Sequence, residues 1–243
     1  MIDFKFKLNT EKLLLKLNEL PEKQIPFATS LALNRTAKGA KEELVKKMSS
    51  SFQNPTPFIM NSTYILAGNK KDPSVEIGHK KFTKRVSPSP VLYAEIFGGN
   101  RALKASEKAL GTRYVPSKFE PLDQYGNIPG GVIKKILSAL SLSHRSSGYQ
   151  SNITPKSKKR QIARGTFRDL VIIKKGNRRG LKPGVFERRG EGDFRRLTPV
   201  LHFIDSTNYP IRYPFYDIVN NYYRDKIEEH IGDAMRLALA TQR

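Results

Sequence analysis

The sequence of 243 residues contains no cysteine and no tryptophan, and it has only 22 acidic residues against 44 lysines and arginines. The lack of cysteine excludes disulfide bonds and thiolate metal ligands. No apolar run approaches the length of about 18 residues that suggests a membrane-spanning helix. The first twenty residues also lack the apolar centre of a signal peptide. We therefore expect no membrane partner.

The excess of positive charge is the most pronounced property of the composition. The formal net charge is +22 at pH 7, and 38% of the residues are hydrophobic. A chain of this length can bury a substantial core and still expose a large polar surface. Copies of such a protein repel one another unless an anionic partner or an assembly neighbour offsets the charge. Nucleic acid and acidic protein surfaces are the expected partners.

Two long segments have the apolar periodicity of amphipathic helices. The first begins near Pro26, because proline is favoured in a first helical turn, and the second begins at Pro214. Small residues in the first segment would allow another backbone to approach closely. The apolar positions that support the two helices are Leu33, Ala37, Ala40, Leu44, Met48, Phe215, Val219, Ile227, Ala234 and Ala238.

Shorter segments predict a mixture of strands and further helices. Alternating or compact apolar runs bounded by turn residues indicate strands. The strands are expected over residues 2–8, 63–66, 74–78, 170–173, 184–188 and 197–204. The last three should form an antiparallel meander. Additional helices are expected over residues 10–20 and 130–142, and over residues 91–110 with an interruption at Gly98 and Gly99, whereas residues 115–129 should be irregular.

These elements predict an α+β fold. The N-terminal and C-terminal helices should pack together, beside a small antiparallel sheet with long basic loops. We expect one structural domain with a body over residues 1–142 and a flexible basic arm over residues 143–165. Residues 166–243 should form a basic β-meander and a C-terminal helix that packs back on the body.

Much of the positive charge is concentrated between residues 142 and 200. This segment contains 16 basic and 4 acidic residues, a net charge of +12. Lysine and arginine bind phosphates without reading sequence, and no base-reading motif accompanies them. We expect contact with DNA or an acidic protein, although a solvated surface is the simpler alternative. The predicted contact residues are Lys156, Lys158, Lys159, Arg160, Lys174, Lys175, Arg178, Arg179, Arg188, Arg189, Arg195 and Arg196.

No catalytic motif emerges from the sequence. The four histidines form no metal-ligand pattern, and the adjacent residues Glu228, Glu229 and His230 are expected on a solvated helix face. Glu187, with Glu191 and Asp193 nearby, could bind a nuclease metal, but ion pairs with neighbouring arginines explain these acids more simply. We expect no enzymatic activity, no cofactor and no metal site.

Two segments resemble the phage minor tail protein Z family. Residues 26–37 are similar to that family's early helix, which is rich in alanine and carries an Asn-Arg pair, here Asn34 and Arg35. Residues 213–240 are similar to its closing helix. The middle of the chain, including residues 123–127 and 184–190, resembles prophage tail proteins.

The resemblance implies a structural protein of a tailed phage virion, made in the host cytoplasm and assembled into the neck or tail. Its implied partners are copies of itself in a ring, portal, adaptor or tail proteins, and the genomic DNA in the channel. A nonspecific DNA-binding or packaging protein is the first alternative, and a metal-dependent nuclease is the second.

Overall fold

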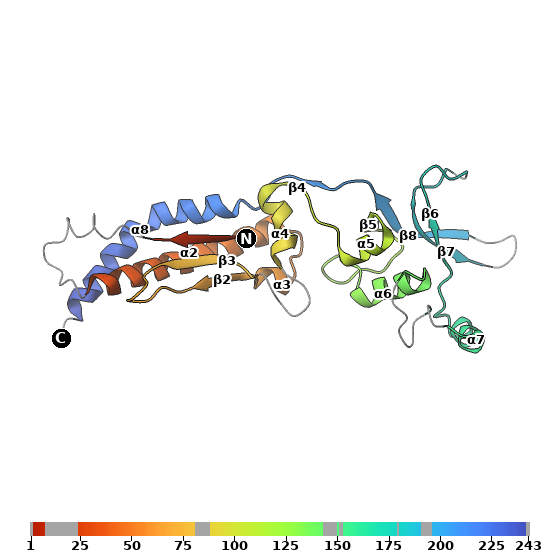
Figure 1. The fold of residues 1–243 in the computed structure, drawn as a ribbon, viewed down its shortest axis with the longest axis horizontal. Coiled ribbons are helices and arrows are strands. Elements are labelled where there is room, and N and C mark those ends of the chain that lie inside the picture. Colours follow the sequence, from red (N-terminus) through yellow and green to blue (C-terminus); the bar gives the residue numbers. More distant parts are fainter. Residues whose placement is uncertain are drawn as a thin grey trace. The chain divides into compact units, whose positions relative to one another are not determined.

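The computed structural model divides the chain into two compact units, whose elements are labelled in Figure 1. Unit 1 comprises Met1–Arg101 and Asn208–Arg243, and unit 2 comprises Ala102–Thr207. Unit 2 is therefore inserted into the sequence of unit 1. The structure describes residues 2–7, 24–80, 88–142, 150, 153–178, 180–190 and 196–241. The helix predicted over residues 10–20 lies outside this set.

Two long helices, one from each end of the sequence, pack against each other in unit 1. Helix α2 spans Ile25–Ser51 and helix α8 spans Phe215–Ala240. Small side chains allow the two backbones to approach closely at one end of this contact. The alanines buried there are Ala28, Ala32, Ala234 and Ala238.

Two further contacts fix how α8 crosses α2. Gly39 lies against the ring of Tyr222, and any side chain at position 39 would collide with that ring. The hydroxyl of Thr36 donates to the carbonyl of Ala32 and lies 2.9 Å from Nδ1 of His230 on α8. Shape and hydrogen bonding therefore both specify the pairing of the two helices.

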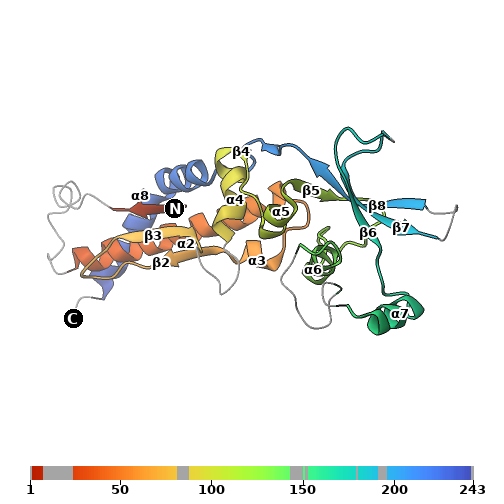
Figure 2. The same cartoon turned by 45° about the vertical axis from the view of Figure 1, so that its right-hand side comes forward.

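A three-stranded antiparallel sheet completes the core of unit 1. Its order is β1 (Asp3–Phe6), β3 (Val75–His79) and β2 (Thr63–Leu66). Figures 1 and 2 both show α2 running alongside β2 and β3. Loop residue Gly68 is tied to α2, because the side-chain amide of Asn34 donates to its carbonyl and accepts from its N–H, both at 3.0 Å.

Among the described residues, one face of this sheet packs in the core. The register aligns Phe4, Ile77 and Ile65 across the three strands, and these side chains pack into the same core as α2 and α8. Lys5 and Glu76 are opposite each other on the other face. One buried and one polar face is the usual arrangement for an antiparallel sheet, and it explains the alternation in the sequence.

The remaining elements of unit 1 surround the point where the chain leaves it. Helices α3 (Pro57–Met60) and α4 (Pro88–Phe97) precede strand β4 (Gly99–Asn100), which pairs with β9 (Asn208–Tyr209). This short ladder joins the two strands that flank the insertion. Among the described helices, none combines the length and apolar character needed to cross a lipid bilayer.

Unit 2 contains a four-stranded antiparallel sheet. The order is β5 (Arg113–Pro116), β8 (Arg196–Ile204), β7 (Gly184–Arg189) and β6 (Leu170–Ile173). Helices α5 (Ala105–Leu110), α6 (Gly130–Ala139) and α7 (Pro155–Ala163) lie in the same unit. The buried core is formed by Ile136, Leu170, Val185, Val200 and Leu201.

The α+β class is confirmed, as is the packing of the first and last long helices. The three strands of the basic meander are also confirmed and are antiparallel. A fourth strand, β5, occupies part of the segment predicted to be irregular. Pro116 at its end weakened the strand signal, since proline is confined to special positions in sheets.

The predicted domain division is wrong. Residues 1–142 do not form one body, because unit 2 begins at Ala102, and the meander and α8 belong to different units. The predicted arm over residues 143–165 contains helix α7. Lysine, arginine, glutamine and alanine are good helix formers even where no apolar stripe marks a helix.

A buried histidine makes the stability of unit 1 depend on pH. His79 is 1% exposed, lies 3.0 Å through Nδ1 from the hydroxyl of Ser62, and contacts the rings of Tyr213 and Phe215. Burial lowers the pKa of His79 from 6.5 to about 4. The unfolded chain therefore binds a proton at a higher pH than the folded chain does.

The free energy of unfolding should fall by about 3 kcal/mol from this residue as the pH decreases from 6.5 to 4. Above pH 6.5 His79 is neutral in both the folded and the unfolded chain, and this loss of stability is absent. His79→Gln removes the titrating group. The free energy of unfolding of the original protein and of this variant, measured by urea denaturation and plotted against pH, should therefore differ by an amount that changes between pH 6.5 and 4. Parallel curves would contradict the assignment.

Candidate nucleic-acid interface

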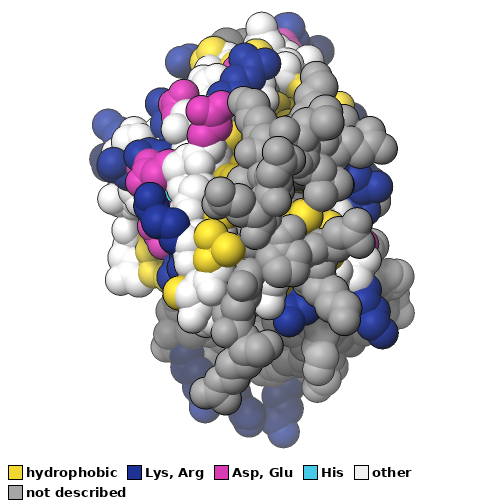
Figure 3. Space-filling model, turned by 90° about the vertical axis from the view of Figure 1, so that its left-hand side faces the viewer, with side chains coloured by type: hydrophobic (Ala, Val, Ile, Leu, Met, Phe, Trp, Pro, Cys, Tyr) yellow, Lys and Arg dark blue, Asp and Glu magenta, His cyan; other side chains and the backbone are white. Residues whose placement is uncertain are grey.

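The two units share the positive charge unequally. Unit 2 contains 22 basic and 8 acidic residues, a formal net charge of +14. The longer unit 1 carries the remaining +8. On the face drawn in Figure 3, basic side chains lie apart from one another, with acidic side chains among them. The larger excess of positive charge makes unit 2 the candidate interface.

Helix α7 carries the first group of predicted contact residues. Lys156, Lys158, Lys159 and Arg160 are all exposed, and the helix has no buried residue. Its start is well defined, because the Thr154 hydroxyl accepts from the N–H of Ser157 and the Ser157 hydroxyl accepts from the N–H of Thr154. Pro155 takes the first position. The helix is thus specified locally rather than by packing.

The charges of α7 oppose its own stability. Residues 155–164 contain five cations and no acid. Lys156 is three and four residues from Lys159 and Arg160, spacings at which like charges on a helix repel. The ammonium of Lys158 lies 5.2 Å from the centre of the Phe167 ring. Within the described residues, no carboxylate forms an ion pair with any of the five.

The turn between β6 and β7 carries the second group. The side chain of Asn177 orders this turn by donating to the carbonyls of Lys174 and Leu181. Lys175 lies 3.4 Å from Asp205, and both side chains are exposed. Lys174 and Arg178 are exposed and have no carboxylate partner in the described part of the chain. Arg179 lies outside the described residues.

The third group follows the β7–β8 hairpin. Arg188 pairs with Asp169 at 2.7 Å, and Arg189 pairs with Glu187 at 2.8 Å. Arg196 is exposed and is opposite Arg189 in the register. Arg195 is not among the described residues. The described members of the predicted set therefore fall into two groups. Lys175, Arg188 and Arg189 pair with a carboxylate, whereas the others, mainly on α7, have no carboxylate partner among the described residues.

Two further exposed cations, which were not predicted contacts, also lack a carboxylate partner among the described residues. Arg164 ends α7, and Lys182 follows the β6–β7 turn. Neither has a carboxylate partner among the residues that the structure describes. Both residues lie close to predicted contacts in the sequence, and this proximity could have identified them.

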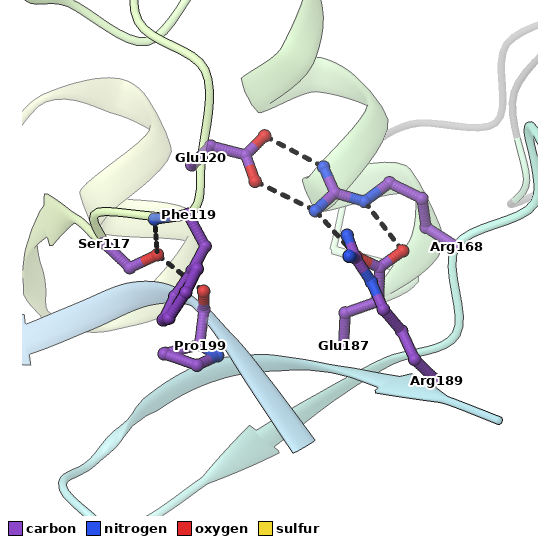
Figure 4. A network of polar contacts seen from close by, with 7 residues as sticks. All are labelled: Ser117, Phe119, Glu120, Arg168, Glu187, Arg189 and Pro199. Carbon is purple, nitrogen blue, oxygen red and sulfur yellow. Dashed lines mark hydrogen bonds and ion pairs between the residues drawn. The ribbon is translucent and has the colours of Figure 1, made fainter. Parts of the chain in front are cut away.

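A network of ion pairs around two buried carboxylates lies within unit 2 (Figure 4). The guanidinium of Arg168 donates two hydrogen bonds of 2.9 Å to the carboxylate of Glu120 and two of 3.3 Å to that of Glu187. Arg189 also donates to Glu187. The Glu120 side chain is 4% exposed and that of Glu187 is 10% exposed.

This network joins three parts of unit 2 that are distant in sequence. Glu120 follows β5, Arg168 precedes β6, and Glu187 lies on β7. Burial alone would lower the pKa of Arg168, but hydrogen bonds to Glu120 and the nearby charges of both glutamates raise it above its ordinary value. Arg168 therefore remains charged, and it acts in the structure rather than at the surface.

A hydroxyl extends the same support to the loop after β5. The Ser117 Oγ donates to the carbonyl of Pro199 at 2.5 Å and accepts from the N–H of Phe119 at 3.2 Å. Neither this link nor the pairing of Glu120 with Arg168 could be predicted, because no sequence pattern relates residues so far apart. The loop is consequently tied to both β8 and the segment before β6.

Glu187 was the described member of the candidate nuclease site. Its carboxylate is held by Arg168 and Arg189, so the predicted ion pair with a neighbouring arginine is present for Arg189. The predicted surface position is wrong, because the Glu187 side chain is 10% exposed and its other partner, Arg168, is distant in sequence. Glu191 and Asp193 lie outside the described residues. Within the described ranges, no three histidine or acidic side chains gather closely enough to hold a metal ion.

The described histidines have separate surroundings. His79 is buried in unit 1, His202 is half-buried on β8, and His230 contacts Thr36. His144 lies outside the described residues. Glu228 and Glu229 are exposed as predicted, but half-buried His230 is part of the contact between α2 and α8.

Comparisons with protein-family models, with curated proteins and with solved structures give no match to this chain.

Removing the centre of the network should destabilise unit 2 strongly. Arg168→Ala leaves two buried carboxylates short of a partner, a change that costs about 3–5 kcal/mol. Urea denaturation followed by circular dichroism measures the change in stability. The matched control is Arg188→Ala, which breaks an ion pair whose side chains are 41% and 37% exposed, and it should cost less than about 1 kcal/mol. Equal destabilisation by the two variants would contradict the assigned role.

Proposed function

We propose that this protein is a structural component of a tailed phage virion that lies beside the DNA in the neck or tail. In this role unit 2 contacts DNA through the cations of α7 and the β6–β7 turn. The proposed protein partners are further copies in a ring and the portal, adaptor or tail proteins. No catalytic step is part of the proposal.

The observation that carries the proposal is the character of α7. This helix buries none of its residues, carries a high density of cations and lacks ion-pair partners among the described residues. A nine-residue helix is marginal in water even without internal repulsion. An array of phosphates would remove the repulsion and stabilise the helix, as expected for a segment that orders further on binding.

The resemblance to minor tail protein Z supports the virion assignment. The two resembling segments correspond to α2 and α8, which pack together. Asn34 of the Asn-Arg pair ties α2 to Gly68 and so has a structural role. A resemblance based on helices that build a scaffold agrees with a protein that serves as a building part.

A nonspecific DNA-binding or packaging protein is the second candidate. The same α7 surface supports it, because phosphate contacts are independent of where the protein resides. The two candidates differ in whether the protein is required for complete particles.

Removing unpaired cations should change the salt dependence of DNA binding more than removing paired ones. Replacement of Lys156, Lys159 and Arg160 by alanine should make the slope of log K against log salt less steep by about 0.9 for each phosphate that the variant no longer neutralises. The control replaces Lys175, Arg188 and Arg189, which have carboxylate partners. Fluorescence anisotropy with duplex DNA gives both slopes, and the same change in each would argue against the proposed surface.

Particles made without this protein should be defective. We expect electron microscopy to show heads without tails, or tails that have not joined heads, because a connector is missing. Restoring the gene in trans should restore complete particles. Complete and infectious particles in its absence would contradict the virion assignment and favour the second candidate.

A further inference from the structure

Strand β2 has an edge that pairs with no other described strand. It is the outer strand in the order β1–β3–β2. The N–H of Lys80 donates to the carbonyl of Ser62, and the register pairs Tyr64 with Gly78 and Ile65 with Ile77. Because hydrogen-bonded and non-hydrogen-bonded pairs alternate in an antiparallel ladder, the backbone N–H and carbonyl of Ile65 point away from β3. They are oriented to pair with an added strand.

A groove of about 470 Å³ lies beside this edge, where α2 passes β2. Its apolar lining comes from Val45 of α2 and Ile65 of β2. The other lining side chains are those of Lys38, Lys41, Lys46 and Glu42. Side chains of a strand alternate between its two faces. Every second side chain of a strand added to β2 would therefore enter the groove.

The charges around the groove indicate which side chains would enter it. Lys38 and Lys41 form no ion pair with any described carboxylate, and the pair of Lys46 with Glu43 is long, at 3.6 Å, and exposed. Lysine stems can cover apolar surface while their ammonium groups remain at the rim. The groove thus offers apolar contact from Val45 and Ile65, and its charged lining is net positive, with three lysines and the single carboxylate of Glu42.

We propose that the β2 edge and this groove bind an extended segment of a partner protein in which every second side chain, on the face toward the groove, is acidic or apolar. The acidic groups would pair with Lys38 and Lys41, and the apolar groups would cover Val45 and Ile65. A second copy of the chain is a poorer occupant, because each copy carries a net charge of +22. This surface belongs to unit 1 and does not depend on the DNA-binding role of unit 2.

A labelled peptide that alternates serine with glutamate and valine is the probe, and fluorescence anisotropy measures its binding to the full chain. Lys38→Glu combined with Lys41→Glu should weaken binding at least about tenfold, because both rim charges become repulsive. The control, Arg35→Glu with Lys47→Glu, makes the same charge change on α2 outside the groove and should change affinity less than about twofold.

Amide exchange measured by NMR identifies the site independently of charge. Exchange of the Ile65 amide should slow when the peptide binds, whereas that of Tyr64, which already faces β3, should not change. Lysines beside an edge strand commonly protect it from pairing with another strand. If this is the only role of Lys38 and Lys41, the peptide will not bind. Absence of peptide binding would overturn the proposal. So would equal weakening of binding by the control variant, or an Ile65 amide whose exchange the peptide does not change. Pairing of two copies through β2 without peptide, detected by sedimentation, would also overturn it.

Discussion

The close contact between α2 and α8 is the constraint on which the rest of the architecture depends. Alanines at one end, and Gly39 under Tyr222 farther along, let helices from opposite ends of the sequence approach closely. Their contact closes unit 1 around the core that the sheet shares. Unit 2 can then be an insertion, because the chain leaves and re-enters unit 1 through paired strands β4 and β9.

The inserted unit must fold despite its excess of positive charge. Two of its few acidic residues, Glu120 and Glu187, lie inside the fold. There they bind Arg168 and link three separate segments. Asp169 and Asp205 neutralise single cations at the surface. The cations of α7 and part of the β6–β7 turn have no such partner among the described residues. The charge distribution thus separates cations that maintain the fold from cations oriented toward solvent.

The elements that could be predicted from the sequence are those with strong local signals. Helices α2 and α8 have long apolar stripes, and β2, β3, β6, β7 and β8 are compact apolar runs between turn residues. Strand β5 is short and ends in proline, and α7 has no apolar stripe, so their signals were weak. The insertion of unit 2 and the pairing of Glu120 with Arg168 depend on contacts between distant residues. Within the candidate interface, residue types could be predicted, but which cations were neutralised could not.

The central claim is that unit 2 faces a polyanion through α7 while α2 and α8 serve as a scaffold. Hydrogen exchange of the full chain, measured by mass spectrometry with and without duplex DNA at low salt, tests it most directly. We expect DNA to slow exchange in α7 and in the β6–β7 turn and to leave α2 and α8 unchanged. Protection confined to α2 and α8, or no protection at all, would contradict the claim.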